Sequence, residues 1–142
     1  MSKSTISTFQ LFEMFPTPES AKPYLQQPEA LMNYVYANAL GNGDVNTRDG
    51  MIYRGGGVIQ ITGRANYKIC GDALGVDFES EPVLLESSRY AALSAAWYWE
   101  KHGCNELADA NEFITITRRI NGGLNGQEQR VALLEQATSI IV

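Results

Sequence analysis

Apolar side chains recur at the three- and four-residue spacing of amphipathic helices along most of the chain. Leu31, Tyr34 and Val35 illustrate this spacing, since they fall at positions i, i+3 and i+4. The same spacing predicts helices over residues 28–39, 62–74, 88–101, 112–120 and 127–141. The pattern of apolar and polar positions therefore predicts a mainly α protein.

The predicted helix over residues 88–101 is expected to be the most buried one. Tyr90, Leu93 and Trp97 form an apolar stripe along it, and the alanines beside this stripe allow close helix contacts. The aromatic rings at 97–99 could also stack on sugars, but their place inside an alanine-rich helix favours core packing. The last predicted helix is expected to bury Val131, Leu134, Thr138 and Ile141.

Proline, glycine and hydroxyl residues set the expected helix ends. Gly41 is well placed to end the helix over residues 28–39. Thr62 is expected to cap the next helix, and Gly75 follows its last residue. Before these helices, residues 11–15 form a short apolar patch that Pro16 stops, and residues 1–10 are expected to be flexible.

Three consecutive glycines interrupt the helical pattern at residues 55–57. Glycine lets the backbone approach another group closely or take positive φ. The run 58–61 is expected to be a short extended segment, and Gln60, Thr62 and Asn66 place polar groups on or beside it. We predict that this stretch forms a rigid floor that contacts a ligand.

Length and composition indicate one globular domain, residues 1–142. Hydrophobic residues make up 44% and charged residues 19%, which argues against disorder. The net charge of −5 argues against a protein that binds duplex nucleic acid. No apolar run reaches the ~18 residues of a membrane span, and the polar start lacks a signal core. We therefore expect a protein that is cytoplasmic as synthesised.

The sequence indicates neither a metal nor a cofactor. In the turn-rich loop 41–50, Asp44 and Asn46 alternate as in a calcium loop. Arg48 stands where a third ligand is needed and would repel the ion, so we reject the calcium site. The three glycines also fail as a dinucleotide fingerprint, because Gln60 occupies the position of its third glycine.

The two cysteines, Cys70 and Cys104, are interpreted as structural residues. With a single histidine, His102, they supply too few ligands for a zinc site. A disulfide between them stays open, although a cytosolic chain does not imply one.

Four separated motifs together resemble glycoside hydrolase family 19, and most closely its bacterial and phage-endolysin branch. They are Asn38-x-x-Gly-Asn-Gly-Asp44, Tyr53-Arg-Gly-x-Gly-x-Ile-Gln-Ile-Thr-Gly-Arg-x-Asn-Tyr67, Ala95-Ala-Trp-Tyr-Trp99 and Ile116-Thr-Arg-Arg-Ile-Asn-Gly-Gly-Leu-Asn-Gly126. The resemblance covers about residues 11–137, in the order and spacing of the family. It implies a lysozyme-like, mostly α fold whose cleft accepts β-1,4-linked N-acetylated glycans, as in chitin or peptidoglycan.

The resemblance also implies roles for individual residues. Gln60 and Asn66 would bond the sugar, Thr62 would help to hold the attacking water, and Asn121 would bond the substrate from the facing wall. Gln60 and Asn121 could instead tie the extended segment to the last loop, as buried amides often do. The full set of implied substrate-binding residues is Tyr53, Gln60, Thr62, Asn66, Tyr67, Asn121 and Arg130.

The carboxylate pair of the family has no counterpart in these motifs. The resemblance implies an inverting mechanism with a general acid and a base about 6.5–9.5 Å apart. The family holds its acid in a His-Glu-Ser helix, whereas the one histidine here is His102, so we expect the chain to begin after that helix. Glu13, flanked by apolar residues, is the remaining candidate acid, although it matches a non-catalytic helix position. Asp44 and Asp49 could place one carboxylate near the water.

Gly56 is a second departure from the family, which usually has arginine at this position. Three interpretations follow from the missing carboxylate pair. The chain is a hydrolase domain whose catalytic helix lies elsewhere or was lost, a module that binds glycan without cleaving it, or an immunity or accessory protein. We expect the exposed flank of helix 88–101 to be covered by the N-terminal segment, a second copy or a partner chain. Reaching a cell wall would require a separate release or secretion route.

Overall fold

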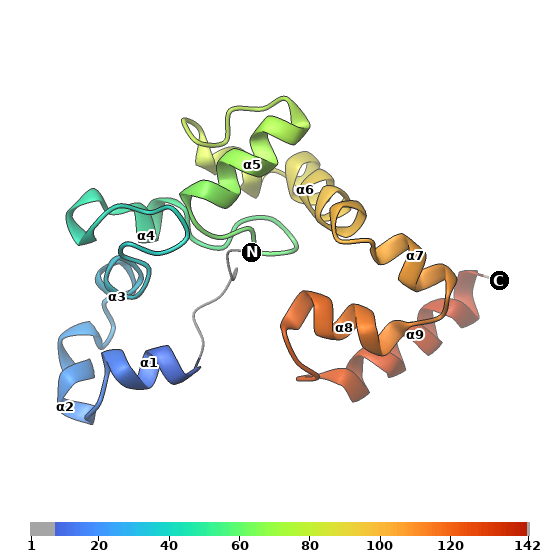
Figure 1. Ribbon diagram of the computed structural model, residues 1–142, viewed down its shortest axis with the longest axis horizontal. Coiled ribbons are helices and arrows are strands. Elements are labelled where there is room, and N and C mark those ends of the chain that lie inside the picture. Colours follow the sequence, from blue (N-terminus) through green and yellow to red (C-terminus); the bar gives the residue numbers. More distant parts are fainter. Residues whose placement is uncertain (1–7, 142) are drawn as a thin grey trace. The chain divides into compact units, whose positions relative to one another are not determined.

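The computed structural model describes residues 8–141, and their side chains from Gln10 onward (Figure 1). Within that range the chain is helical, and its only β pairing is an isolated antiparallel bridge between Gly56 and Ile61. The predicted mainly α class is confirmed. The flexibility expected for residues 1–10 falls mostly outside the described range.

The chain divides into two compact units, Met1–Tyr98 and Trp99–Val142. The first contains α1 (Thr8–Met14), α2 (Pro18–Ala21), α3 (Pro28–Val35), α4 (Asp49–Ile52), α5 (Arg64–Leu74) and most of α6 (Ser88–Lys101). It also contains three short 3-10 helices, η1 (Lys22–Tyr24), η2 (Val45–Thr47) and η3 (Pro82–Glu86). The second contains α7 (Cys104–Asp109), α8 (Phe113–Asn121) and α9 (Gln127–Ile141). A single domain over residues 1–142 stays a prediction.

Helix α3 ends earlier than the sequence predicts. Its last residue is Val35, and Gly41 does not end it. The chain turns instead through Asn38 and Leu40, which both have positive φ, 55° and 56°. Helix α4 packs closely on α3, because a Cβ at Gly50 would lie 2.2 Å from the carbonyl oxygen of Met32. The two helices lie side by side in Figure 1.

Helix α5 begins two residues later than predicted and without the expected cap. Gly63, with φ 89°, precedes its first residue, Arg64, and no side chain of residue 63 is there to cap it. The hydroxyl of Thr62 donates instead to the carbonyl of Gln60, so it does not cap the helix. The far end agrees with the sequence, since Gly75 has the left-handed conformation that often follows a helix.

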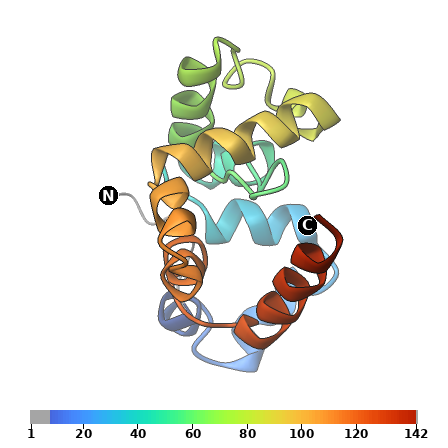
Figure 2. The same ribbon diagram turned by 90° about the vertical axis from the view of Figure 1, so that its right-hand side faces the viewer.

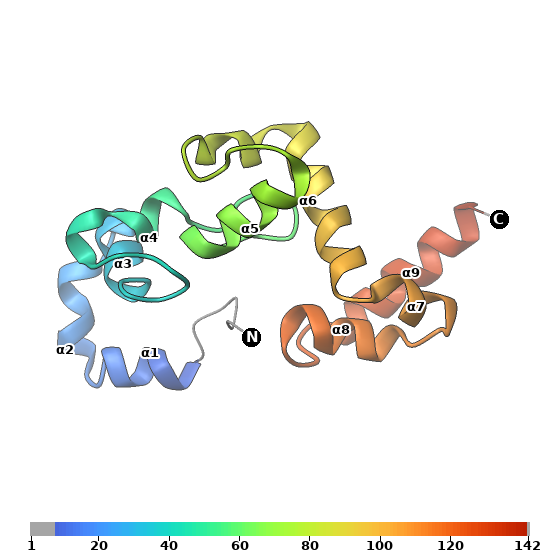
Figure 3. The same cartoon turned by 45° about the horizontal axis from the view of Figure 1, so that its top comes forward.

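The hydrophobic core of the first unit lies between α5, η3 and the segment before α5. Its buried members are Tyr53, Ile61, Tyr67, Cys70, Phe78 and Leu85. Tyr90 and Trp97 of α6 pack against this cluster and are half-buried. Figure 3 shows α5 and α6 as neighbours in the ribbon. The predicted apolar stripe therefore faces the core in part, while its middle residue, Leu93, is 39% exposed.

Helix α6 spans residues 88–101 as predicted, but it is not the most buried helix. Among its residues only Ser94 is fully buried. Small side chains line this helix where the Gly57 backbone packs on it. A Cβ at Gly57 would lie 2.8 Å from the hydroxyl of Ser94 and 3.4 Å from the Cα of Ala91. Backbone therefore approaches this face more closely than a large side chain would allow.

The helices of the second unit run from orange to red in Figure 2. Helix α7 is absent from the sequence prediction, because six residues are too few to show a helical period. Helix α8 covers the predicted stretch shifted by one residue. Helix α9 has the predicted bounds, but the expected burial of its apolar residues is wrong: Val131 is 36% and Leu134 45% exposed, and no residue of α9 is buried.

The burial prediction for α9 fails because its apolar residues are not confined to one face. Leu133 and Ile140 lie off the predicted stripe and are 64% and 74% exposed. Thr138 and Ile141, the other members of the stripe, are exposed as well. A helix with such weak amphipathicity does not define a single packed side.

Both cysteine thiols are buried, and neither is in a disulfide. This agrees with their interpretation as structural residues. No helix among the described residues is long and apolar enough to span a membrane.

Candidate functional site

The glycine-rich stretch forms a tight reversal of the chain. The amide of Gly56 donates to the carbonyl of Ile61 at 2.9 Å, and the amide of Ile61 donates back to Gly56 at 2.8 Å. Residues 57–60 between them are turn, so the expected extended segment is limited to this single bridge. Val58 lies on the turn and is 76% exposed.

Gln60 is the exposed polar residue of this turn. Its φ of 59° lies in the left-handed region, which a residue with a side chain seldom adopts. Backbone of this kind costs free energy and persists where the surrounding structure holds it in place. The side-chain amide of Gln60 donates to the carbonyl of Gly57 at 3.1 Å, which fixes its orientation on the surface.

The structure brings three of the predicted ligand residues together in residues 60–66, which we call the site segment. The hydroxyl of Thr62 donates to the carbonyl of Gln60 at 3.0 Å. The side-chain amide of Asn66 donates to the carbonyl of Thr62 at 2.7 Å. Thr62 is buried and Asn66 half-buried, so Gln60 is the most accessible of the three. These three residues of the site segment carry amide and hydroxyl groups, and none of them is charged.

Tyr53 and Tyr67 lie in the core rather than on an open surface. They are 4% and 2% exposed, and their rings meet edge to face with centroids 5.3 Å apart. The hydroxyl of Tyr53 donates to the carbonyl of Glu79 at 2.9 Å, and that of Tyr67 to the carbonyl of Arg54 at 2.7 Å. In this structure both rings support the site segment, and contact with a ligand by either residue stays a prediction.

Burial raises the pKa of Tyr67 to about 12. We expect one of the seven tyrosines to ionise near this pH in an absorbance titration, and this step to be missing in Tyr67→Phe. Between pH 10 and 12 the unfolded chain loses this proton while the folded protein keeps it, so the stability from neutral Tyr67 falls as pH rises. Equal alkaline slopes of unfolding free energy in both proteins would contradict this assignment.

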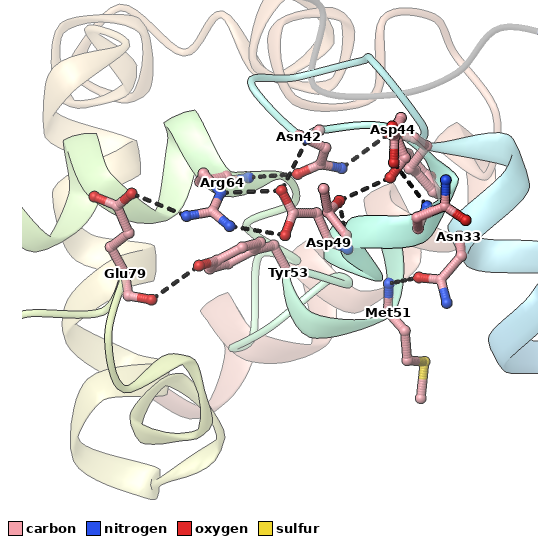
Figure 4. Close-up of polar contacts among 12 residues, drawn as sticks. Asn33, Asn42, Asp44, Asp49, Met51, Tyr53, Arg64 and Glu79 are labelled. Carbon is pink, nitrogen blue, oxygen red and sulfur yellow. Dashed lines mark hydrogen bonds and ion pairs between the residues drawn. The ribbon is translucent and has the colours of Figure 1, made fainter.

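The loop before the glycines holds the first turn of α5 (Figure 4). The side-chain oxygen of Asn42 accepts from the backbone amide of Arg64 at 2.8 Å. The carbonyl of Leu40 accepts from the amide of Ala65 at 3.0 Å. The side-chain amide of Asn42 donates in turn to the carbonyl of Tyr36 at 3.0 Å. Residues more than twenty positions earlier therefore cap a helix that has no capping side chain of its own.

Asp49 is a buried acid with every oxygen occupied. It is 2% exposed, and it accepts from Arg64 Nη2 at 2.8 Å, from Arg64 Nε at 3.0 Å and from the amide of Gly43 at 2.8 Å. Figure 4 shows the Arg64 guanidinium pointing at this carboxylate. The hydrogen bonds from Arg64, followed by that from Gly43, hold the pKa of Asp49 below its ordinary value despite burial. Because both oxygens already accept hydrogen bonds and the side chain is buried, this carboxylate is poorly placed to take a proton from the attacking water.

The other two candidate carboxylates lie on exposed surfaces. Asp44 precedes η2 and caps it, since its side chain accepts from the amide of Asn46 at 2.8 Å. Glu13 lies near the end of α1 and is exposed, so it lacks the apolar enclosure that its sequence neighbours suggested. In the part of the chain that the structure describes, no cluster of three or more acidic, histidine or cysteine residues could hold a metal ion.

Asn121 and Arg130 belong to the second unit. Asn121 is the last residue of α8, is exposed, and donates to the carbonyl of Asn125 at 3.3 Å. The Nε of Arg130 donates to the hydroxyl of Thr117 at 3.0 Å, and its guanidinium lies 5.4 Å from the ring centre of Phe113. Within this unit Arg130 thus ties α9 to α8, while Asn121 shapes the glycine turn that follows.

Comparison with known proteins supports a common family for these motifs. The family model described as Chitinase class I matches residues 24–115, more than half of the chain. A Haemophilus influenzae protein described as a glycosyl hydrolase family 19 domain-containing protein is 48% identical over 119 residues. Basic endochitinase B from Arabidopsis thaliana is 34% identical over 106 residues, and inactive chitinase-like protein 1 from Hevea brasiliensis is 33% identical over 95 residues.

The matched regions cover unequal shares of the proteins. The Haemophilus match covers 84% of this chain and 58% of that relative. The Arabidopsis match covers 58% of this chain and 32% of the relative, and the Hevea match covers 53% and 30%. The chain therefore spans less than two thirds of the length of each of these three relatives.

Proposed function

The chain belongs to glycoside hydrolase family 19, and from this premise we propose that it binds β-1,4-linked N-acetylated glycan along the site segment. The observation that carries the proposal is the grouping of Gln60, Thr62 and Asn66 beside an exposed turn. Neutral sugars are bound by a few well-placed amides and hydroxyls next to apolar surface, and Val58 supplies such a surface on the same turn.

We further propose that hydrolysis, where it occurs, uses a carboxylate pair from outside the site segment. General acid-base assistance is commonly worth about 10²–10⁴-fold for each group, so the site segment alone would be nearly inert. Asp49 is committed to Arg64, and Glu13 is exposed. We therefore place the acid and the base on residues other than these two. An inverting pair would stand about 6.5–9.5 Å apart.

The second candidate function is a module that binds glycan without cleaving it. The observation that favours it is the relative named inactive chitinase-like protein 1, which is 33% identical over 95 residues. Chitin and peptidoglycan both contain N-acetylated sugars, so each of the two proposals applies to either polymer.

Calorimetric titration with chitin oligomers and soluble peptidoglycan fragments tests the binding proposal. We expect Gln60→Ala to weaken binding by about tenfold, the loss of one to two hydrogen bonds to the sugar. Gln136→Ala is the matched control, because it removes another exposed glutamine far along the chain and should leave affinity unchanged. Equal affinities in the wild type and Gln60→Ala would reject this location for the site.

Turnover of the same oligomers separates the two candidate functions. The binding module is expected to bind without releasing shorter products. Measurable turnover would favour the hydrolase, and the Glu13→Gln variant would then show whether Glu13 takes part. We expect Glu13→Gln to keep any wild-type rate, because the exposed Glu13 lacks the enclosure of a general acid.

A further inference from the structure

The polar groups of the site segment lie on both sides of Gly63. Thr62 precedes this glycine and Asn66 follows it, and the hydrogen bond from Asn66 to the carbonyl of Thr62 spans it. Gly63 has φ 89° and ψ 146°, a conformation that essentially only glycine adopts. Glycine has little conformational preference of its own, so contacts from elsewhere must fix the backbone at this point.

Arg64, directly after Gly63, has contacts in three directions. Its guanidinium forms two hydrogen bonds with Asp49, at 2.8 and 3.0 Å. Its Nη1 lies 3.3 Å from the carboxylate of Glu79, and its central carbon lies 4.8 Å from the ring centre of Tyr53. Figure 4 shows the guanidinium between Asp49 and Glu79. A planar group held at its edges and over a ring has little freedom to rotate.

The same residue is fixed through its backbone. The amide of Arg64 donates to Asn42, which itself donates to the carbonyl of Tyr36. The amide of Gly63 donates to the carbonyl of Tyr53 at 2.8 Å. Side chain and backbone of one arginine therefore connect the loop 40–49, the core tyrosine and the start of α5.

We propose that Arg64 is a positioning residue for the glycan site: it holds the loop 40–49 against the first turn of α5 and thereby sets the geometry of the site segment. The inference rests on the proposed function for its ligand. Arg64 itself presents no group to the sugar in this role. Arg64 acts through Gly63, because the conformation of Gly63 determines whether the side chain of Asn66 can donate to the carbonyl of Thr62.

An ordinary surface ion pair on the same helix provides the contrast. Lys68 and Asp72 of α5 lie 3.1 Å apart, with side chains 56% and 66% exposed. The Arg64 side chain is 39% exposed, and that of its partner Asp49 only 2%. Lys68→Met is therefore a matched control for Arg64→Met, because each removes one cation from the same helix but only one of them touches the loop.

NMR of the unliganded full chain, labelled with ¹⁵N, tests the geometry. In Arg64→Met we expect shifted side-chain amide signals of Asn66 and Gln60 and faster hydrogen exchange at Ala65, whose amide is bonded to Leu40. Lys68→Met should leave all three readouts as in the wild type. Arg64→Lys keeps the charge without the two-point contact, so we expect it to resemble Arg64→Met, and it serves as the second variant if Arg64→Met does not fold.

Titration with a chitin oligomer, at a temperature where circular dichroism shows the variants folded, tests the consequence. We expect binding weakened on the order of tenfold in Arg64→Met and unchanged in Lys68→Met, because small misplacements of binding groups are costly. Unchanged Asn66 and Gln60 signals in Arg64→Met, or full recovery by Arg64→Lys, would overturn the inference. A wild type that binds no oligomer would refute the proposed function, while the signals of the unliganded protein would still decide the role of Arg64.

Discussion

Gly63→Ala is expected to lower the free energy of unfolding by about 4 kcal/mol, the largest effect we predict for a single methyl group. Two causes add. Gly63 has φ 89° and ψ 146°, where a Cβ strains the backbone, and the new Cβ would lie 2.3 Å from the Cβ of Leu40. The carbonyl oxygen of Leu40 would lie 2.8 Å away, and this carbonyl cannot move without losing its hydrogen bond to Ala65.

Gly75→Ala, at the other end of α5, is the matched control. Gly75 also has positive φ, 68°, but a Cβ there would meet nothing within 4 Å. We expect it to cost about 1 kcal/mol, the usual penalty of the left-handed conformation alone. Urea unfolding of both variants measures the difference of about 3 kcal/mol, which belongs to the close approach of Leu40. Equal losses in the two variants would mean that this contact is not formed.

Asp49→Ala is expected to lower the free energy of unfolding by about 3 kcal/mol. Breaking a buried ion pair usually costs about 3–5 kcal/mol, because the remaining charge loses its partner without regaining water. Arg64 is 39% exposed and can regain some hydration, which places the expectation at the lower end. The amide of Gly43 also loses its acceptor.

Asp72→Ala removes an exposed acid from α5 and is the control for this substitution. Its pair with Lys68 is solvated on both sides, so we expect a change within about 0.5 kcal/mol. Thermal and urea unfolding of the two variants at pH 7 give the comparison. A loss in Asp49→Ala no larger than that in Asp72→Ala would contradict the structural role of the pair.

The pH dependence of stability gives an independent readout of Asp49. Its pKa is lowered in the folded protein, so the stability it contributes is present above its unfolded pKa, about 3.9. That contribution is lost as pH falls through the lower, folded pKa. We expect the unfolding free energy of the wild type to drop over this acid range more steeply than that of Asp49→Ala, whose curve lacks this one group.

Long helices with clear ends could be predicted from the sequence. Helices α6 and α9 have the bounds that the apolar spacing indicates, and Gly75 follows α5 as expected. Short helices could not be predicted, because α4 and α7 hold only four and six residues and show no period. The burial of α9 could not be predicted either. Apolar spacing shows which side of a helix is suited to packing, but it does not show whether another element packs there.

The candidate site could be predicted where its contacts are local. Gln60, Thr62 and Asn66 are close in the sequence, and the structure joins them through bonds between neighbours. The bonds that hold this segment join residues far apart: Asp49 and Arg64 are separated by 15 positions, Asn42 and Arg64 by 22. No sequence period marks such pairs, so the sequence alone leaves Asp49 as a carboxylate that could lie near the attacking water.

The aromatic residues show a second limit of sequence reasoning. Tyr53 and Tyr67 have the rings expected of sugar-contacting residues, yet the same rings suit a core when a carbonyl accepts the hydroxyl. Residue type does not separate these two uses. Only the burial of both residues in the structure does so.

The remote capping of α5 has a consequence for the order in which the protein folds. An eleven-residue helix that starts after a glycine is marginal in isolation, because nucleation is unfavourable and short helices gain few hydrogen bonds. Leu40 and Asn42 supply acceptors for its first amides only once the intervening chain has closed into a loop. A peptide of residues 60–75 should therefore be largely unstructured in water, and α5 should form in the same kinetic step as its contacts with residues 40–49 rather than before them.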